Sequence, residues 1–254
     1  MRVPSKTQPA RFLVMTAALS AIGLLMLAVL GTGARATQAR EAALPLDHFT
    51  CYPTTFGSFK VRKVTLADQF GKSVAVVSQP LRLCSPVSKN GQALINPRAH
   101  LVCYPIKRTP QFQTRKVLVK NQFGSQTMTV VRPETLCVPS SKATTGTPGP
   151  IPTRLDHYTC YAVDPGGTFK RRVVKLADQF GTSRDTVVTP VSLCAPTRKR
   201  GSALVQARLH LTCYRIKSAT KARRVVIRNQ FGILKGLPTV RQLLCLPSTK
   251  TVQP

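Results

Sequence analysis

A frame of about 50 residues recurs four times along the chain, and this recurrence constrains the fold more than any other feature. Each copy carries H-x-x-C-Y, then a turn phrase, D-Q-F-G or N-Q-F-G, then L-C-x-P-x-x-K. The turn phrases occupy residues 68–71, 121–124, 178–181 and 229–232, and in every copy the glycine of the phrase lies 13 residues before the next cysteine. A unit of this size buries little core by itself, so we expect the copies to pack in pairs.

The copies are also grouped in twos. Residues 46–142 match residues 155–250, with LDHFTCY in the first unit and LDHYTCY in the second. Between them, residues 143–154 read ATTGTPGPIPTR, a Thr, Pro and Gly composition that is typical of an exposed linker. The sequence therefore predicts two tandem domains, each a pseudo-twofold duplication of the half-repeat.

Within a copy, the apolar residues recur with a period of two. Val64 and Leu66 alternate with Lys63 and Thr65, and the same alternation precedes the turn phrases of copies 2 and 4. This is the pattern of a half-buried strand. We expect an all-β fold of three- or four-stranded halves, and the pattern leaves open whether they form a sandwich or a barrel.

The turn phrase is typical of a β-hairpin. Asp or Asn in its first position and Gly in its fourth fit a type I turn followed by a glycine bulge. The phenylalanine in its third position is not needed for a turn and has two interpretations. The ring either folds back over the end of the core, which is the commoner use of a lone aromatic, or stays exposed and stacks on a sugar or base.

Eight cysteines fall two per copy, an even number that predicts disulfides in an exported chain. We expect each pair to close within its own copy: Cys51 with Cys84, Cys103 with Cys137, Cys160 with Cys194, and Cys213 with Cys245. Pairing between copies stays open, because sequence alone does not fix connectivity. Zinc is the rival use of these sulfurs, but the chain lacks the C-x-x-C spacing of most structural zinc sites. We expect no metal and no other cofactor.

Catalytic chemistry has little support in the sequence. His48 and Cys51 are three residues apart, so on a strand they point to opposite faces and do not form a base and nucleophile pair. The chain has eight acids and neither a phosphate-binding glycine loop nor a nucleophile elbow. We therefore expect a protein that is not an enzyme. The face shared by His48 and Tyr52 recurs in every copy and fits either cross-strand packing or a polar binding strip.

Positive charge dominates the chain. From Thr37 onward, 34 Lys and Arg residues stand against 8 Asp and Glu residues, a surplus of 26 positive charges that would attract polyanions. An arginine lies six residues before the first residue of every turn phrase, with a second basic residue directly after it in three copies. The candidate polyanion-binding residues are Arg62, Lys63, Arg115, Lys116, Arg172, Arg223 and Arg224. The alternative is a solvated strand edge, where Lys and Arg block pairing with other sheets.

Residues 1–36 have the pattern of a signal peptide. Three basic residues precede an uncharged apolar run over residues 12–30, and Ala34 and Ala36 supply the small-x-small spacing that signal peptidase accepts. The run is 19 residues, nearly enough to span a bilayer, so retention as an N-terminal anchor is the alternative. In both cases we expect the rest of the chain to be extracytoplasmic.

The combination of LDHFxCY, [DN]QFG and LCxPxxK over residues 46–250 resembles an exported bacterial repeat family of unknown function. The resemblance implies an extracytoplasmic repeat module and supplies no catalytic or binding residues. Together with the charge, it favours a non-catalytic secreted or envelope-associated module that binds or scaffolds. Its expected partner is an anionic polymer such as cell-wall glycan, extracellular nucleic acid or anionic lipid. A purely structural surface spacer is the first alternative, and a hydrolase that uses Asp47 or His48 is the second.

Overall fold

The computed structural model describes residues 45–253, which belong to one compact unit. Every regular element in this range is a strand, and the fourteen strands join in one sheet, so the all-β prediction is confirmed. Copy 1 contains β1 (His48–Phe56), β2 (Arg62–Asp68), β3 (Gly71–Val77) and β4 (Arg82–Lys89); copy 2 contains β5 (His100–Thr109), β6 (Arg115–Asn121) and β7 (Gly124–Ala143). Copy 3 contains β8 (His157–Pro165), β9 (Arg172–Asp178) and β10 (Gly181–Lys199); copy 4 contains β11 (His210–Lys217), β12 (Val225–Asn229), β13 (Gly232–Pro238) and β14 (Leu243–Val252).

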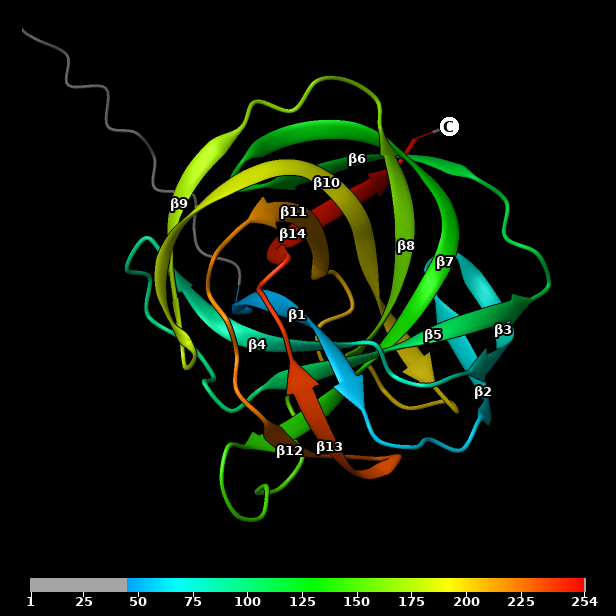
Figure 1. Ribbon diagram of the computed structural model, residues 1–254. Coiled ribbons are helices and arrows are strands. Elements are labelled where there is room, and N and C mark those ends of the chain that lie inside the picture. The colour runs from blue at the N-terminus through cyan, green and yellow to red at the C-terminus, as the bar shows by residue number, and fades with distance from the viewer. Residues whose placement is uncertain (1–44, 254) are drawn as a thin grey trace, which may run out of the picture. The chain divides into compact units, whose positions relative to one another are not determined.

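Eight of these strands close into a barrel. Its antiparallel pairs are β1–β4, β4–β5, β5–β7, β7–β8, β8–β10, β10–β11 and β11–β14, and β14 returns to pair with β1. Figure 1 shows these strands curving around a common centre. Of the two expected architectures, the barrel is therefore the one that forms, and its closure leaves its member strands without an open edge.

The barrel takes strands from all four copies, and this differs from the expected division at residues 143–154. Phe49 of copy 1 pairs with Cys245 of copy 4, and Cys137 of copy 2 pairs with Tyr158 of copy 3. The two long repeats thus form one compact unit in place of two tandem domains. The physical reason is that two copies supply only half of the closed ring, and their outer strands would keep unpaired edges without the other half.

The remaining strands belong to hairpins that leave the ring and cross onto other copies. The hairpin β2–β3 of copy 1 pairs with β5 of copy 2, where Val77 faces Ile106, and with the end of β10 of copy 3, where Leu66 faces Lys199. The hairpin of each of the other copies likewise pairs with the next copy and with the copy after that: β6–β7 pairs with β8 and β14, β9–β10 with β11 and β4, and β12–β13 with β1 and β7. The four copies are therefore interleaved in a cyclic pattern.

Each hairpin ends in the turn that the sequence predicts. Asp68 pairs with Gly71 across the first turn, and the turn glycine has a positive φ, between 106° and 146°, in all four copies. Glycine adopts this conformation without the steric cost that a Cβ atom brings. The Asp68 carboxylate accepts a hydrogen bond of 2.8 Å from the amide of Phe70, which stabilises the turn locally. The hairpin interpretation is confirmed.

The interior of the barrel is filled by side chains that alternate inward along its strands. Phe49 and Cys51 of β1 lie in one buried cluster with Cys84 of β4 and with the equivalent residues of the other copies. Four further residues of this cluster come from just before the H-x-x-C-Y strands and cover the end at which those strands begin: Leu46, Ala99, Leu155 and Leu209. We call this the closed end, and we call the opposite end, where Pro53 pairs with Arg82, the open end.

Candidate functional site

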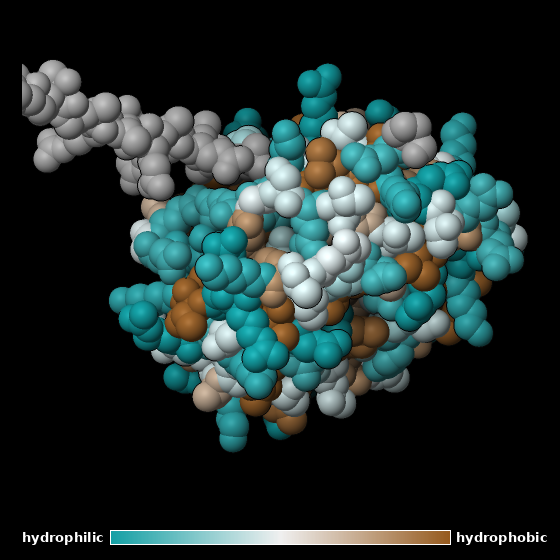
Figure 2. All heavy atoms as spheres, turned by 90° about the horizontal axis from the view of Figure 1, so that it is seen from above, coloured by the Kyte–Doolittle hydropathy of each residue, from teal (hydrophilic) through white to brown (hydrophobic). Residues whose placement is uncertain are grey.

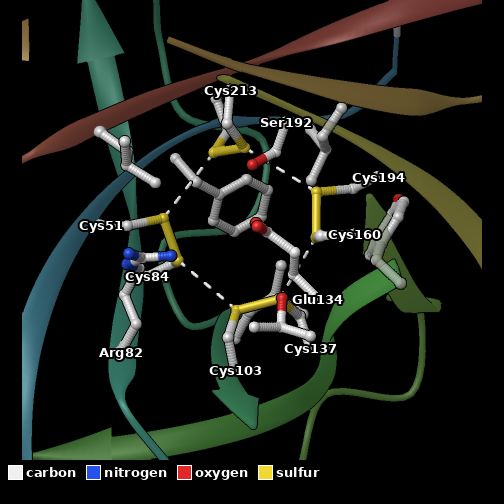
Figure 3. Close-up of a pocket in the computed structure, with 17 residues that line it drawn as sticks. Cys51, Arg82, Cys84, Cys103, Glu134, Cys137, Cys160, Ser192, Cys194 and Cys213 are labelled. Atoms are coloured by element: carbon white, nitrogen blue, oxygen red, sulfur yellow. Dashed lines mark hydrogen bonds between the residues drawn. A yellow bond between two sulfur atoms is a disulfide. The ribbon is translucent and has the colours of Figure 1, made fainter. Parts of the chain in front are cut away.

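The eight cysteines form the four disulfides that the sequence predicts, each within its own copy. Each bond joins residues that face each other on adjacent antiparallel strands, as Cys51 of β1 and Cys84 of β4 do. Neighbouring disulfides also touch, with Sγ–Sγ distances of 3.8 Å for Cys51 and Cys245, 3.9 Å for Cys84 and Cys103, 3.5 Å for Cys137 and Cys160, and 3.8 Å for Cys194 and Cys213. The eight sulfurs form a closed ring inside the barrel, the sulfur ring of Figure 3. The described residues include no free thiol.

Each turn phrase packs against a tyrosine that lies two copies away. The Tyr161 hydroxyl of copy 3 donates to the Asp68 carboxylate of copy 1 at 2.5 Å, and the centroids of the Tyr161 and Phe70 rings are 4.8 Å apart in an edge-on contact. The equivalent ring pairs are Tyr214 with Phe123, Tyr52 with Phe180, and Tyr104 with Phe231. The phenylalanine therefore folds back onto the molecule, which is the first of its two interpretations.

A copy has Asp in the first position of its turn phrase where a buried arginine lies beside that position, and Asn where none does. Arg241 lies 3.1 Å from a carboxylate oxygen of Asp178, and Arg108 lies 3.4 Å from one of Asp68. The other two copies have a buried amide at this position, Asn121 and Asn229. Each amide donates to the tyrosine hydroxyl instead, at 2.9 Å and 2.8 Å. A buried carboxylate without a cation is costly, so the neutral residue stands where the arginine is missing.

The histidines of H-x-x-C-Y are covered by the turn phrases of neighbouring copies. Nε2 of His48 lies 3.0 Å from the side-chain oxygen of Gln122, and His210 has the same relation to Gln69 at 3.2 Å. Burial, with a smaller contribution from the positive charge of Lys89, lowers the pKa of His48 to about 4. Burial likewise lowers the pKa of His210 to about 4. The His and Tyr face is thus a packing surface between copies and not an open polar strip.

The lysine of L-C-x-P-x-x-K completes this set of contacts. Its ammonium group lies over the phenylalanine ring of a turn phrase in the next copy, an arrangement that favours a cation. The distances to the ring centroid are 5.6 Å for Lys89 and Phe123, 4.1 Å for Lys142 and Phe180, 5.1 Å for Lys199 and Phe231, and 4.6 Å for Lys250 and Phe70. Burial lowers the pKa of Lys142 to about 7. The residues that define the repeat are therefore used in contacts between copies.

Most acidic side chains of the described part are buried in internal contacts. The Asp47 carboxylate accepts hydrogen bonds of 2.7 Å from the amides of Ile95 and Asn96, so it fixes a loop, and Asp156 does the same for the loop at residues 205–206. The other buried carboxylates belong to Asp68, Asp178 and Asp185, which pair with arginines. Only Glu134 and Asp164 of the seven acids in residues 45–253 reach the surface. The positive charge of the surface is therefore almost unneutralised.

The seven candidate polyanion-binding residues are all exposed. Arg62, Arg115 and Arg172 are the first residues of β2, β6 and β9, and Arg223 lies just before β12. Because the four hairpins occupy equivalent places around the barrel, these residues form four separate patches and not one site. Arg172 is partly engaged, since its guanidinium donates to the carbonyl of Phe123 at 3.0 Å and lies 5.4 Å from the centroid of that ring.

The sequence reasoning missed the polar residues of the open end. Arg82, Glu134 and Ser192 line the space at this end of the sulfur ring (Figure 3). Arg82 lies two residues before Cys84 and so shares its inward direction along β4. The spacing of two residues before the cysteine therefore predicts an inward side chain. An arginine at a position that is apolar or small and polar in the other copies is the sequence signal from which this group could have been predicted.

Residues 1–36, expected to be a signal peptide or anchor, lie outside the described residues. Residues 45–253 contain no helix that is long and apolar enough to cross a membrane. Within the same range, no group of three or more His, Cys, Asp or Glu residues is placed to hold a metal ion. The four disulfides indicate an oxidising, extracytoplasmic compartment.

Comparison with known proteins identifies the repeat. A family model described as a repeat of unknown function (DUF7450) matches residues 100–247, more than half of the chain. No curated protein and no solved structure matches the chain. The resemblance to a repeat family of unknown function is confirmed.

Proposed function

The chain belongs to the family of this repeat of unknown function, and because that membership assigns no activity, we propose from the protein's surface that it is a non-catalytic binding or scaffolding module for anionic polymers. The observation that carries the proposal is the distribution of charge. Five of the seven acidic side chains in residues 45–253 are buried in internal contacts, while most Lys and Arg side chains of the same range are exposed around the barrel.

A surface of this kind binds polyanions through the release of their counterions, and the affinity falls steeply with salt. The only ion pair on the surface of the described part joins Arg132 and Glu134, so few exposed cations are compensated by neighbours. In the view of Figure 2, hydrophilic side chains are spread over this face with apolar ones between them. This spread fits contact with a long flexible polymer better than capture of a compact ligand.

The disulfides support the scaffolding part of the proposal. Four crosslinks in one closed barrel hold the basic patches at fixed separations outside the cytoplasm, where glycan, nucleic acid or anionic lipid is present as partner. Secretion by cleavage after residue 36, or anchoring through residues 12–30, would each place the barrel there. The recurring residues are occupied in structural contacts, so a catalytic role finds no support among them.

The test is retention of the disulfide-bonded protein on immobilised heparin and on immobilised polyphosphate, across a salt gradient, with uncharged dextran as the blank matrix. We expect retention that weakens with the logarithm of salt concentration. The variant Arg62→Gln, Arg115→Gln, Arg172→Gln and Arg223→Gln should elute earlier and with a smaller salt slope. Its matched control changes one exposed lysine per copy: Lys72→Gln, Lys120→Gln, Lys175→Gln and Lys235→Gln.

The two variants lose the same formal charge, so they separate position from charge. A larger loss for the arginine variant supports the four patches as the contact residues. Equal losses would mean that the whole surface binds and would refute the assignment of those residues. Retention that does not depend on salt, or no retention, would refute the proposal itself.

A purely structural spacer is the second candidate, and one observation favours it. The recurring His, Tyr, Phe, Gln and Lys residues are used in contacts between copies, which is what a protein selected only for rigidity would need. A spacer predicts no retention on any polyanion and no effect of the arginine substitutions on the function of the cell envelope.

A further inference from the structure

At the open end of the barrel, the four copies differ in chemistry at an equivalent inward position. Two residues before the second cysteine of each copy, an inward position, the residues are Arg82, Thr135, Ser192 and Leu243. In the next layer toward the centre of the barrel, all four copies have cysteine, and each copy forms a disulfide there. A layer that serves only to pad the barrel would be expected to be apolar in every copy, as the layer of Phe49, Leu101, Tyr158 and Leu211 largely is.

Arg82 is the unusual member of this layer. Its side chain forms no hydrogen bond with any described residue, and its Nε atom is buried without a partner. Burial lowers the pKa of Arg82, and the nearby Glu134 carboxylate opposes that effect. Glu134 is itself engaged by Arg132 at 3.0 Å. A guanidinium offers five N–H donors in a planar fork, so Arg82 presents an unfilled site for a planar anion.

The space next to Arg82 is large enough for a small molecule. A hollow of about 710 Å³ opens at this end. Its lining includes four charged residues, Arg82, Arg132, Glu134 and Arg215, together with Ser192 and the apolar residues Val163, Ile216 and Leu243. Below it, the space enclosed by the sulfur ring is about 30 Å³, room for about one water molecule and no more. A ligand in the hollow would therefore lie outside the sulfur ring and not enter it.

The charges of the hollow decide the class of ligand. Arg132 and Glu134 pair with each other, and Arg215 is exposed to solvent. Arg82 is half-buried and its side chain has no partner, so it is the cation that a single carboxylate would match, while the nearby Glu134 carboxylate would oppose a second negative charge. The apolar side chains would cover a short hydrocarbon body. We propose that the open end binds a small monocarboxylate, with the carboxylate held in a bidentate contact by Arg82 and its apolar body against Val163, Ile216 and Leu243. The proposal goes beyond the binding of polymers and does not depend on it.

The test uses probes that share one part each of the expected ligand. Hexanoate has both the carboxylate and the apolar body, hexanol has only the body, acetate has only the carboxylate, and hexyl phosphate carries a second charge. Binding to the disulfide-bonded protein is followed by calorimetry and by the shifts of the backbone amides of residues 82, 134, 163, 192 and 216. We expect hexanoate to bind most tightly and to shift these amides.

Variants at Arg82 sharpen the test. Arg82→Leu copies the residue of copy 4 at the same position and should fold, yet weaken hexanoate binding about tenfold or more, since it removes a charge-assisted contact. Arg82→Lys should recover only part of the affinity, because a lysine keeps the charge but loses the planar fork. Arg62→Leu, on the outer surface, is the control and should bind hexanoate as the unchanged protein does.

Three outcomes would overturn the proposal. They are equal affinity for hexanoate and hexanol, unchanged hexanoate affinity in Arg82→Leu, and absence of binding by any of the four probes. Tighter binding of hexyl phosphate than of hexanoate would refute the choice of a monoanion. Retention of Arg82→Leu on heparin should match that of the unchanged protein, so the failure of one proposal leaves the other standing.

Discussion

The two ends of the barrel are built from the same four copies but follow different rules. Toward the closed end, the copies agree: each contributes a His that is buried or half-buried, a Tyr that meets a turn phrase, and a disulfide. At the open end, equivalent positions carry Arg82, Thr135, Ser192 and Leu243. The difference teaches that a position repeats when its side chain must fit another copy, and varies when it faces space.

The largest expected effect tests whether the disulfide layer, which is the same in all four copies, also contributes most to the stability of the barrel. Replacing both Cys51 and Cys84 by Ala removes a crosslink that closes a loop with a sequence separation of 33. We expect the free energy of unfolding to fall by about 3–4 kcal/mol, because the unfolded chain gains conformational freedom. Urea denaturation of the two proteins measures this. A loss below about 1 kcal/mol would show that the neighbouring disulfides and strand pairs already impose the constraint.

A second substitution tests the pairing of Asp with Arg in the turn phrase. Asn121→Asp places a carboxylate in a copy that lacks the buried arginine found beside Asp68 and Asp178. We expect a loss of about 2–3 kcal/mol at neutral pH, because the new charge is buried without a partner. Thermal denaturation at neutral and acidic pH should show that the loss shrinks as the carboxylate is protonated. If Asn121→Asp is neutral in stability, the account of the Asp and Asn alternation is wrong.

The histidines near the closed end predict a pH dependence. In the folded protein, burial lowers the pKa of His48 from 6.5 to about 4. The unfolded chain therefore binds more protons between these values, so stability is full above about pH 6.5 and falls as the pH drops toward about 4. His48→Gln should reduce the difference in unfolding free energy between about pH 7 and about pH 5 by about 1–2 kcal/mol. An unchanged pH profile in His48→Gln would contradict the burial of a neutral His48.

The smallest effect is expected at the open end. Arg82→Leu should change the free energy of unfolding by less than about 1 kcal/mol, and in the stabilising direction, because a partly desolvated cation without a partner is replaced by an apolar residue. Urea denaturation of Arg82→Leu beside the unchanged protein provides the value. A loss as large as that of the Cys51 and Cys84 variant would erase the distinction between the two ends.

Local chemistry made much of the closed-end frame predictable. The similar spacing of the cysteines predicted the disulfide pairs, and Asp68 and Gly71 predicted a hairpin turn, because both features lie within one copy of the repeat. The crossing of each hairpin onto the next two copies was not predictable, since four copies with the same frame give no local reason for Leu66 to face Lys199 rather than a residue of its own pair of copies. For the same reason, the linker at residues 143–154 suggested a domain boundary where the sheet has none.

The open end was missed for another reason. Arg82 has no recurring partner in the sequence, and a search for repeated residues passes over a position that changes from copy to copy. Its inward direction could be derived from its distance to Cys84, but its lack of a partner is a property of the assembled barrel alone.

The pairing of β1 with β14 has a consequence for the order in which the protein can be made. β1 is the first strand of the chain and β14 is the last, so one edge of β1 stays unpaired until nearly the whole polypeptide is present. Closure of the barrel is then a single late event. A chain that stops after three copies would leave two strand edges unpaired, and such edges pair with other chains and promote aggregation.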